Sequence, residues 1–109
     1  PYGAEIRASW PGPVTWIFPE KSKDYPWFGG ADGSLAVRVT AHPQARRLAA
    51  AAGPLVSTSA NRPGEEAALT IAAAQQYFAE FVDFYLDGEL LTPGKPSQIR
   101  HAVSGDRLR

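Results

Sequence analysis

The stretch at residues 54–61, PLVSTSAN, constrains the fold more than any other part of this chain. Leu55, Val56 and Thr58 favour extended backbone, because bulky and β-branched side chains suit a pleated surface. Residues 62–64, RPG, follow it as a turn signal. We therefore expect this stretch to be the central strand of the fold and to end in a polar turn.

The polar side chains of this stretch are candidate ligand-binding groups. Side chains alternate across a strand, so Ser57 and Ser59 are expected on one face, with Asn61 at the turn. Small hydroxyl groups and an amide let a ligand approach closely and still offer it hydrogen bonds. The alternative is a tight strand–turn junction in which the same groups form hydrogen bonds with the local backbone. These residues by themselves favour that alternative.

Strands are predicted where short runs of aliphatic, aromatic and β-branched residues lie between turn signals. The first two predicted strands are separated by a long loop at residues 19–33, whose aromatic side chains are expected to pack it onto the body of the domain. The predicted strands are residues 14–18, 34–40, 54–61, 82–86 and 97–103.

Helices are predicted between these strands. Pro43 suits a first helical turn, and the apolar stripe at helical spacing that follows it ends at Gly53. Thr70 is a suitable N-cap for a second helix, and residues 2–10 resemble the end of another. The order strand, helix, strand, helix, strand predicts an α/β fold with a mixed twisted sheet and flanking helices.

Composition excludes several classes of protein. Eleven basic and eleven acidic residues cancel among 109, which argues against a strongly basic nucleic-acid-binding domain. Without cysteine, disulfides and thiolate metal sites are excluded. No apolar run could span a membrane and no signal peptide is visible, so a cytoplasmic protein is expected. Methionine is absent too, which predicts a fragment, a processed chain or part of a longer protein.

Arg38 is a candidate anion-binding residue. It shares the face of its predicted strand with the small residues Ala36 and Thr40, which leave room around the guanidinium. A ligand carboxylate or phosphate can accept two parallel hydrogen bonds from such a guanidinium. The alternative, which the strand by itself favours, is a solvated arginine on an edge strand.

The common catalytic constellations are not found. His42 and His101 are far apart in the sequence and lack the neighbouring ligands that a metal site needs. No convincing Ser-His-Asp order is present, so nucleophilic catalysis is poorly supported. The C-terminal arginines form either a phosphate contact or a solvated tail. These arginines are Arg100, Arg107 and Arg109.

Five segments together resemble the YrdC-like family, whose bacterial members are the threonylcarbamoyl-AMP synthases of tRNA modification. The segments occur in the order and rough spacing of that family, and the resemblance covers residues 10–109. The family's Lys-x-Arg motif, which belongs to the first half of its domain, is not found. The resemblance therefore implies that residues 1–109 are the C-terminal portion of a single YrdC-like domain without its N-terminal part. The segments are residues 10–15, 35–43, 55–61, 96–99 and 105–109.

The resemblance implies an ATP-dependent synthesis of L-threonylcarbamoyladenylate. Threonine and bicarbonate form a carbamate, its carboxylate attacks the α-phosphate of ATP, and pyrophosphate leaves. The product then modifies N6 of adenosine 37 in tRNAs that read ANN codons, with the help of partner proteins. ATP is expected to bring Mg²⁺, with no metal ligand identified in the protein. Such a substitution needs positioning and charge stabilisation rather than a protein nucleophile, so no catalytic residue is assigned.

Three binding residues are implied for a concave, positively charged cleft. Ser59 and Asn61 match the family's Ser-x-Asn motif, which binds nucleotide and substrate. Arg38 matches an arginine of the cleft. We therefore expect Arg38, Ser59 and Asn61 to face one cleft.

Three further residues are implied by the remaining motifs. Ser97 matches a serine near the threonine pocket, and Arg109 matches a late arginine near the nucleotide. Thr15 matches the family's Pro-Gly-Pro-x-Thr segment. Because the cleft lysine and arginine of the first half are missing, residues 1–109 alone are expected to be inactive.

Two other functions stay open at this point. One is the related carbamoyl-adenylate-forming domain of hydrogenase maturation proteins, which carry cysteine-rich and further domains elsewhere in the chain. The other is a non-catalytic module that binds double-stranded RNA or tRNA, although the zero net charge weakens this alternative.

Overall fold

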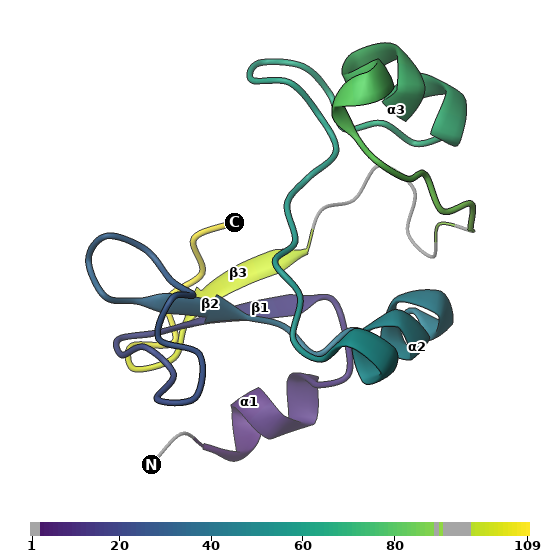
Figure 1. Cartoon of the computed structure of the whole chain (residues 1–109). Coiled ribbons are helices and arrows are strands. Elements are labelled where there is room, and N and C mark those ends of the chain that lie inside the picture. The colour runs from purple at the N-terminus through teal and green to yellow at the C-terminus, as the bar shows by residue number, and fades with distance from the viewer. Residues whose placement is uncertain (1–2, 89, 91–96) are drawn as a thin grey trace. The chain divides into compact units, whose positions relative to one another are not determined.

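The computed structural model describes residues 3–88, 90 and 97–109. The chain forms two compact units (Figure 1). Unit 1 comprises Pro1–Pro54 and Pro96–Arg109, and unit 2 comprises Leu55–Lys95. Within the described ranges, no helix is long and apolar enough to cross a membrane.

A mixed three-stranded sheet forms the centre of unit 1, in the order β2-β1-β3 (Figure 1). β2 is antiparallel to β1, with Trp16 opposite Val37, whereas β3 is parallel to β1, with Thr15 opposite Ile99. Antiparallel and parallel pairing in one sheet, together with helices, confirms the predicted fold class. The strands are β1 (Val14–Phe18), β2 (Leu35–Val37) and β3 (Gln98–His101).

The core of unit 1 lies between β1 and helix α1 (Ala4–Ser9). Trp16 is 1% exposed and Ile6 is 5% exposed. The indole N–H of Trp16 donates to Ser9 Oγ over 2.8 Å, so its polar atom is satisfied although the ring is buried. The face of β1 that carries Trp16 is therefore the packed face of the sheet.

Helix α2 (Pro43–Ala52) begins and ends as its sequence predicts. His42 is the N-cap, and its Nδ1 accepts a hydrogen bond from the Ala45 N–H over 3.3 Å. Gly53 ends the helix with a φ of 86°, and its N–H donates to Ala49 O over 2.8 Å.

Unit 2 contains helix α3 (Ile71–Phe78) and the short 3-10 helix η1 (Ala79–Phe81). Thr70 caps α3 as predicted, because its side chain accepts a hydrogen bond from the Ala73 N–H over 3.1 Å. The Tyr85 hydroxyl donates to Ala79 O over 2.7 Å, which ties the following segment to the end of the helix.

Two predicted strands are absent from the described structure. Residues 54–61 and 82–86 are not paired with any described strand, so both predictions are wrong. β propensity measures how well side chains pack on a sheet, and it produces a strand only where a partner strand lies alongside. Here Val56 is 76% exposed and Phe84 is 75% exposed, so these side chains lack that packing.

The loop at residues 19–33 is held by its own aromatic side chains. Tyr25 stacks on Phe28 with ring centroids 5.7 Å apart, and Trp27 meets both rings edge-on. Trp27 is 70% exposed, whereas Phe28 is half-buried. Trp27 therefore contacts other side chains of the loop, whereas the sequence predicted that it packs onto the body of the domain.

Candidate functional site

Three of the predicted site residues meet at one end of the parallel strand pair. Thr15 lies in β1, and Ser97 directly precedes β3. Their hydroxyl oxygens are 3.3 Å apart. Arg109 approaches the same serine, with Nη2 donating to Ser97 Oγ over 3.2 Å and Nε donating to Ser97 O over 3.0 Å. We call Thr15, Ser97 and Arg109 the polar cluster.

The polar cluster depends on a chain reversal after β3, in residues 104–109, which we call the C-terminal return. Gly105, with a φ of 77°, donates from its N–H to His101 O over 2.8 Å and closes the turn. Leu108 N–H then donates to Ile99 O over 2.7 Å, and Ile99 N–H donates to Arg109 O over 3.1 Å. After this turn, Arg107 pairs with Arg100 of β3 through a single antiparallel bridge.

The sheet face opposite Trp16 is the face of the polar cluster. Thr15 and Ile17 alternate with Trp16 along β1, so both lie on this face. Ala36 is the antiparallel partner of Ile17 and shares its face. Arg38 directly follows the end of β2, and continued alternation from Ala36 would place it on the Thr15 face.

Arg38 itself is exposed, and its guanidinium has no partner among the described residues. The chain stays beside the approach to β1 at this point, because the Gly12 N–H donates to Val39 O over 2.8 Å. Whether Arg38 binds a ligand there stays a prediction.

Ser59 and Asn61 belong to unit 2. Ser59 is exposed and its hydroxyl has no partner among the described residues. Asn61 Nδ2 donates to Arg62 O over 3.0 Å, which is the local backbone role considered from the sequence. Arg38 belongs to unit 1. That Ser59 and Asn61 face one cleft with Arg38 therefore stays a prediction.

The turn after Asn61 is braced by charged and aromatic groups. Arg62 Nη2 lies 2.8 Å from Glu65 Oε1, and the Arg62 guanidinium stands 5.2 Å from the centre of the Tyr77 ring. The Tyr77 hydroxyl donates to Glu66 O over 3.1 Å. These contacts dock the turn on α3 within unit 2.

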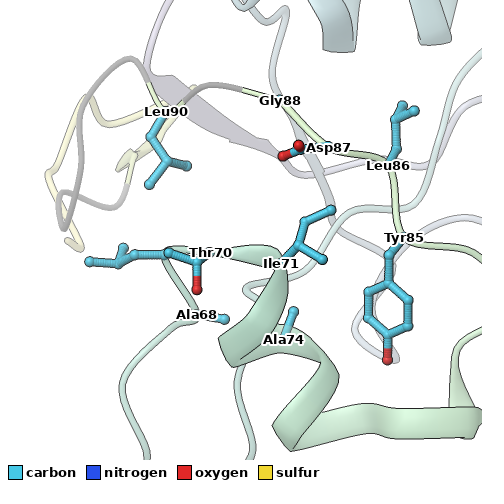
Figure 2. Close-up of a pocket in the computed structure, with 10 residues that line it drawn as sticks. Ala68, Thr70, Ile71, Ala74, Tyr85, Leu86, Asp87, Gly88 and Leu90 are labelled. Carbon is cyan, nitrogen blue, oxygen red and sulfur yellow. The ribbon is translucent and has the colours of Figure 1, made fainter.

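Unit 2 contains a shallow pocket of about 330 Å³ that was not predicted from the sequence (Figure 2). One wall is the start of α3, with Ile71 and Ala74, and the other is the segment with Tyr85 and Leu86. Both walls were predicted from the sequence as regular elements, but the sequence does not indicate that a pocket lies between them. The lining is mostly aliphatic, and it comprises Ala68, Leu69, Thr70, Ile71, Ala74, Tyr85, Leu86, Asp87, Gly88 and Leu90.

Metal-ligating side chains do not gather in the described part of the chain. No group of three or more His, Cys, Asp or Glu residues there could hold a metal ion. His42 serves as a helix cap, and His101 lies in β3. Any Mg²⁺ at this site would need most of its ligands from a bound phosphate and from water.

One loop carboxylate has a shifted pKa. Asp32 Oδ1 accepts hydrogen bonds from the Ser34 N–H over 3.0 Å and from the Ser34 hydroxyl over 2.7 Å. These bonds favour the ionised form and hold the pKa of Asp32 below its ordinary value of 3.8.

Known proteins are similar to this chain in sequence and in fold. A family model for Sua5, YciO and YrdC proteins, described as "Telomere recombination", matches residues 4–109. A threonylcarbamoyl-AMP synthase of Hahella chejuensis is 48% identical over 106 residues, which are 96% of this chain and 58% of that protein. A threonylcarbamoyl-AMP synthase of Chromohalobacter salexigens is 48% identical over 107 residues, which are 97% of this chain and 57% of that protein.

A solved structure of a P. abyssi Sua5 variant matches with a TM-score of 0.79 and 28% sequence identity. The match covers 94% of this chain and 32% of the Sua5 chain. This chain therefore spans somewhat more than half the length of the two curated relatives and about a third of the Sua5 chain. The family model, the curated relatives and the fold agree, and this chain belongs to the Sua5/YrdC family.

Proposed function

We propose that this chain contributes to the ATP-dependent synthesis of L-threonylcarbamoyladenylate from L-threonine, bicarbonate and ATP. The observation that carries the proposal is the polar cluster, in which Arg109 and two hydroxyl groups meet on one face of the sheet. The name of the curated relatives, threonylcarbamoyl-AMP synthase, supports this reaction. The enzyme class in this proposal is nucleotidyltransferase.

Arg109 has donors left for a nucleotide phosphate. Its Nε and Nη2 donate to Ser97, and Nη1 has no partner among the described residues. A guanidinium held by two of its donors pre-organises the third nitrogen, so less conformational freedom is lost when a phosphate binds. In the proposal Arg109 contacts the triphosphate, and the exposed Arg38 supplies a second positive charge from the same face.

The hydroxyl groups of Thr15 and Ser97 are the candidate contacts for the threonine substrate. Each hydroxyl can donate one hydrogen bond and accept two. Ser97 Oγ already accepts from Arg109, and the two hydroxyls share one hydrogen bond across 3.3 Å. The remaining capacity suits a ligand hydroxyl or carboxylate, and Ser59 and Asn61 supply further polar contacts in the proposal.

The proposed reaction needs no nucleophile from the protein. A carboxylate oxygen of the threonine carbamate forms a bond to the α-phosphorus, and the bond from that phosphorus to the oxygen bridging to the β-phosphate breaks. Pyrophosphate leaves with that oxygen. Mg²⁺ on the phosphates, when bound, neutralises charge that develops on the leaving group. The side chains of this protein hold the reactants in line and offset the remaining charge.

The product is proposed to serve tRNA modification. Transfer of its threonylcarbamoyl group to N6 of adenosine 37 in ANN-reading tRNAs would take place in the cytoplasm with partner proteins. The proposal does not require tight RNA binding by this chain, since the basic and acidic residues cancel.

The test measures threonine-dependent pyrophosphate release. We would assay residues 1–109 and, in parallel, a chimera in which residues 4–109 replace the matching segment of the Hahella chejuensis relative. The chimera is expected to release pyrophosphate only when ATP, threonine and bicarbonate are all present, and to make an adenylate identified by its mass. The 109-residue chain alone is expected to show little turnover. A folded chimera that binds ATP but never forms the adenylate would overturn the proposal.

A further inference from the structure

Arg100, one of the C-terminal arginines, is not a solvated side chain, because all three nitrogens of its guanidinium have partners within the chain. Its Nε and Nη2 both donate to Gly105 O, over 3.1 Å and 2.9 Å. Its Nη1 donates to Glu5 Oε1 over 2.6 Å, and the guanidinium carbon stands 4.7 Å from the centre of the Trp16 ring. Three parts of unit 1, namely α1, the sheet and the C-terminal return, thus converge on one side chain.

Arg100 acts from the packed face of the sheet. It is the parallel partner of Trp16, so its side chain lies on the Trp16 face and not on the Thr15 face. The side chain is 26% exposed, and its charge is therefore partly shielded from water. Hydrogen bonds from a charged, half-buried donor are stronger than those of a neutral one.

The bond to Gly105 matters because the C-terminal return is short. The turn at Gly105 determines where Leu108 and Arg109 meet β3, because their N–H groups donate to Ile99 O over 2.7 Å and 3.3 Å. An anchor on Gly105 O therefore restricts the turn from which Arg109 reaches Ser97.

We propose that Arg100 is a positioning residue, which anchors the C-terminal return from the packed face and so holds the Arg109 guanidinium on Ser97 at the opposite face. The positioning role is a matter of geometry and stands apart from the reaction. Its effect on ligand affinity rests on the proposed function. Lysine cannot replace Arg100, because one ammonium group cannot reach Gly105 O and Glu5 together while lying flat on Trp16.

The experiment compares amide hydrogen exchange by NMR in the 109-residue chain and four variants. Arg100→Gln and Arg100→Lys remove the anchor. Glu5→Gln removes only the exposed ion-pair partner, and Arg7→Gln removes an arginine charge from α1 without touching the return. The Ala102 amide, which donates to Ile17 O, serves as the internal reference for the sheet.

We expect the Leu108 and Arg109 amides to exchange about tenfold faster in both Arg100 variants, the effect of losing a charge-assisted hydrogen bond. The Ala102 amide should keep its rate, and the Arg109 Nε–H signal should move to the shift of a free guanidinium. Glu5→Gln should change these rates by less than about threefold, as expected for an exposed ion pair. Unchanged rates in the Arg100 variants, equal acceleration of all amides, or rescue by lysine would each overturn the inference.

A second arm titrates Mg-ATP into the chimera described above, carrying the same substitutions. Arg100→Gln should weaken binding where Arg109 is present and should have no further effect in an Arg109→Gln background, because the two residues then act in series. Additive losses would contradict the positioning role. If the exchange result holds while Arg100→Gln and Arg109→Gln both leave the Mg-ATP affinity of the chimera unchanged, the inference about Arg100 stands and the proposed role of Arg109 in nucleotide binding fails.

Discussion

Arg109 donates two hydrogen bonds to Ser97, twelve residues earlier in the chain, from Nε to the carbonyl oxygen over 3.0 Å and from Nη2 to the hydroxyl over 3.2 Å. The carbonyl fixes one edge of the guanidinium, and the hydroxyl fixes the adjacent nitrogen. The hydroxyl also contacts Thr15 Oγ1 over 3.3 Å. The orientation of the arginine is thus determined by β3 and β1 together.

Ser97→Ala is the first prediction. It removes the Nη2 bond and the contact with Thr15, while the Nε bond to the backbone stays. Because a hydrogen bond to a charged group is lost, we expect Mg-ATP to bind roughly tenfold more weakly, as measured by calorimetric titration. Ser22→Ala, a hydroxyl deletion in the 19–33 loop, should leave the affinity unchanged. Equal affinities of the Ser97→Ala variant and the unchanged protein would show that the polar cluster does not bind nucleotide.

Local sequence signals predicted those elements whose ends and faces are determined locally. The strand at Val14–Phe18 has the predicted bounds, because alternation and flanking prolines suffice to define it. Gly53 and Thr70 cap helices where expected, because a cap needs only the residues within one turn. The prediction of a strand at residues 54–61 was wrong, because a strand needs a neighbouring strand and no local sequence pattern specifies one.

The candidate site was predictable residue by residue but not as an arrangement. Motif resemblance singled out Thr15, Ser97 and Arg109 separately, and the structure shows that they touch. Their meeting depends on the parallel register of β1 and β3 and on the turn at Gly105, which no short motif encodes. The structural role of Arg100 was missed for the same reason, since its partners lie on α1, β1 and the turn.

Trp16→Ala is the second prediction, with Trp27→Ala as its control. Trp16 is 1% exposed and donates to Ser9, whereas Trp27 is 70% exposed. We expect the free energy of unfolding to fall by about 3–5 kcal/mol for Trp16→Ala, the cost of a large core truncation. The Trp27 variant should lose less than about 1 kcal/mol. Urea unfolding followed by circular dichroism measures both values.

The Trp16→Ala variant can fail to fold, because small domains are stable by only about 5–15 kcal/mol. Trp16→Phe then serves in its place, since it keeps an aromatic ring and loses the bond to Ser9. Its unfolding free energy should fall clearly more than that of Trp27→Phe. Equal losses at both positions would contradict a core centred on Trp16.

Thr70→Ala is the third prediction and concerns α3. The Thr70 side chain accepts a hydrogen bond from the Ala73 N–H, which has no partner inside the helix. Its removal should lower the stability of unit 2 by about 1 kcal/mol, whereas Thr70→Ser should keep the cap and the stability. Hydrogen exchange of the Ala73 and Ala74 amides measures the change. Equal exchange in the alanine and serine variants would exclude a stabilising cap.

The last prediction is the pH dependence of the loop around Asp32. The N–H and then the hydroxyl of Ser34 hold the pKa of Asp32 below 3.8 in the folded chain. A carboxyl whose folded-state pKa is lowered stabilises the fold above its unfolded pKa, and this contribution is lost as the pH falls through the lowered folded value. The loop turn, in which Gly30 N–H donates to Ser34 O over 2.9 Å, should therefore loosen only below pH 3.8.

A carbon-detected NMR titration of the Asp32 carboxyl should give a midpoint below 3.8. In Ser34→Ala the midpoint should rise but stay below that value, because the alanine N–H still donates to Asp32 and this backbone bond is the largest cause of the shift. Asp32→Asn should remove the pH dependence of the loop signals of Gly30 and Gly33. A wild-type midpoint at or above 3.8, or one that Ser34→Ala does not move, would mean that Ser34 does not hold the carboxylate in solution.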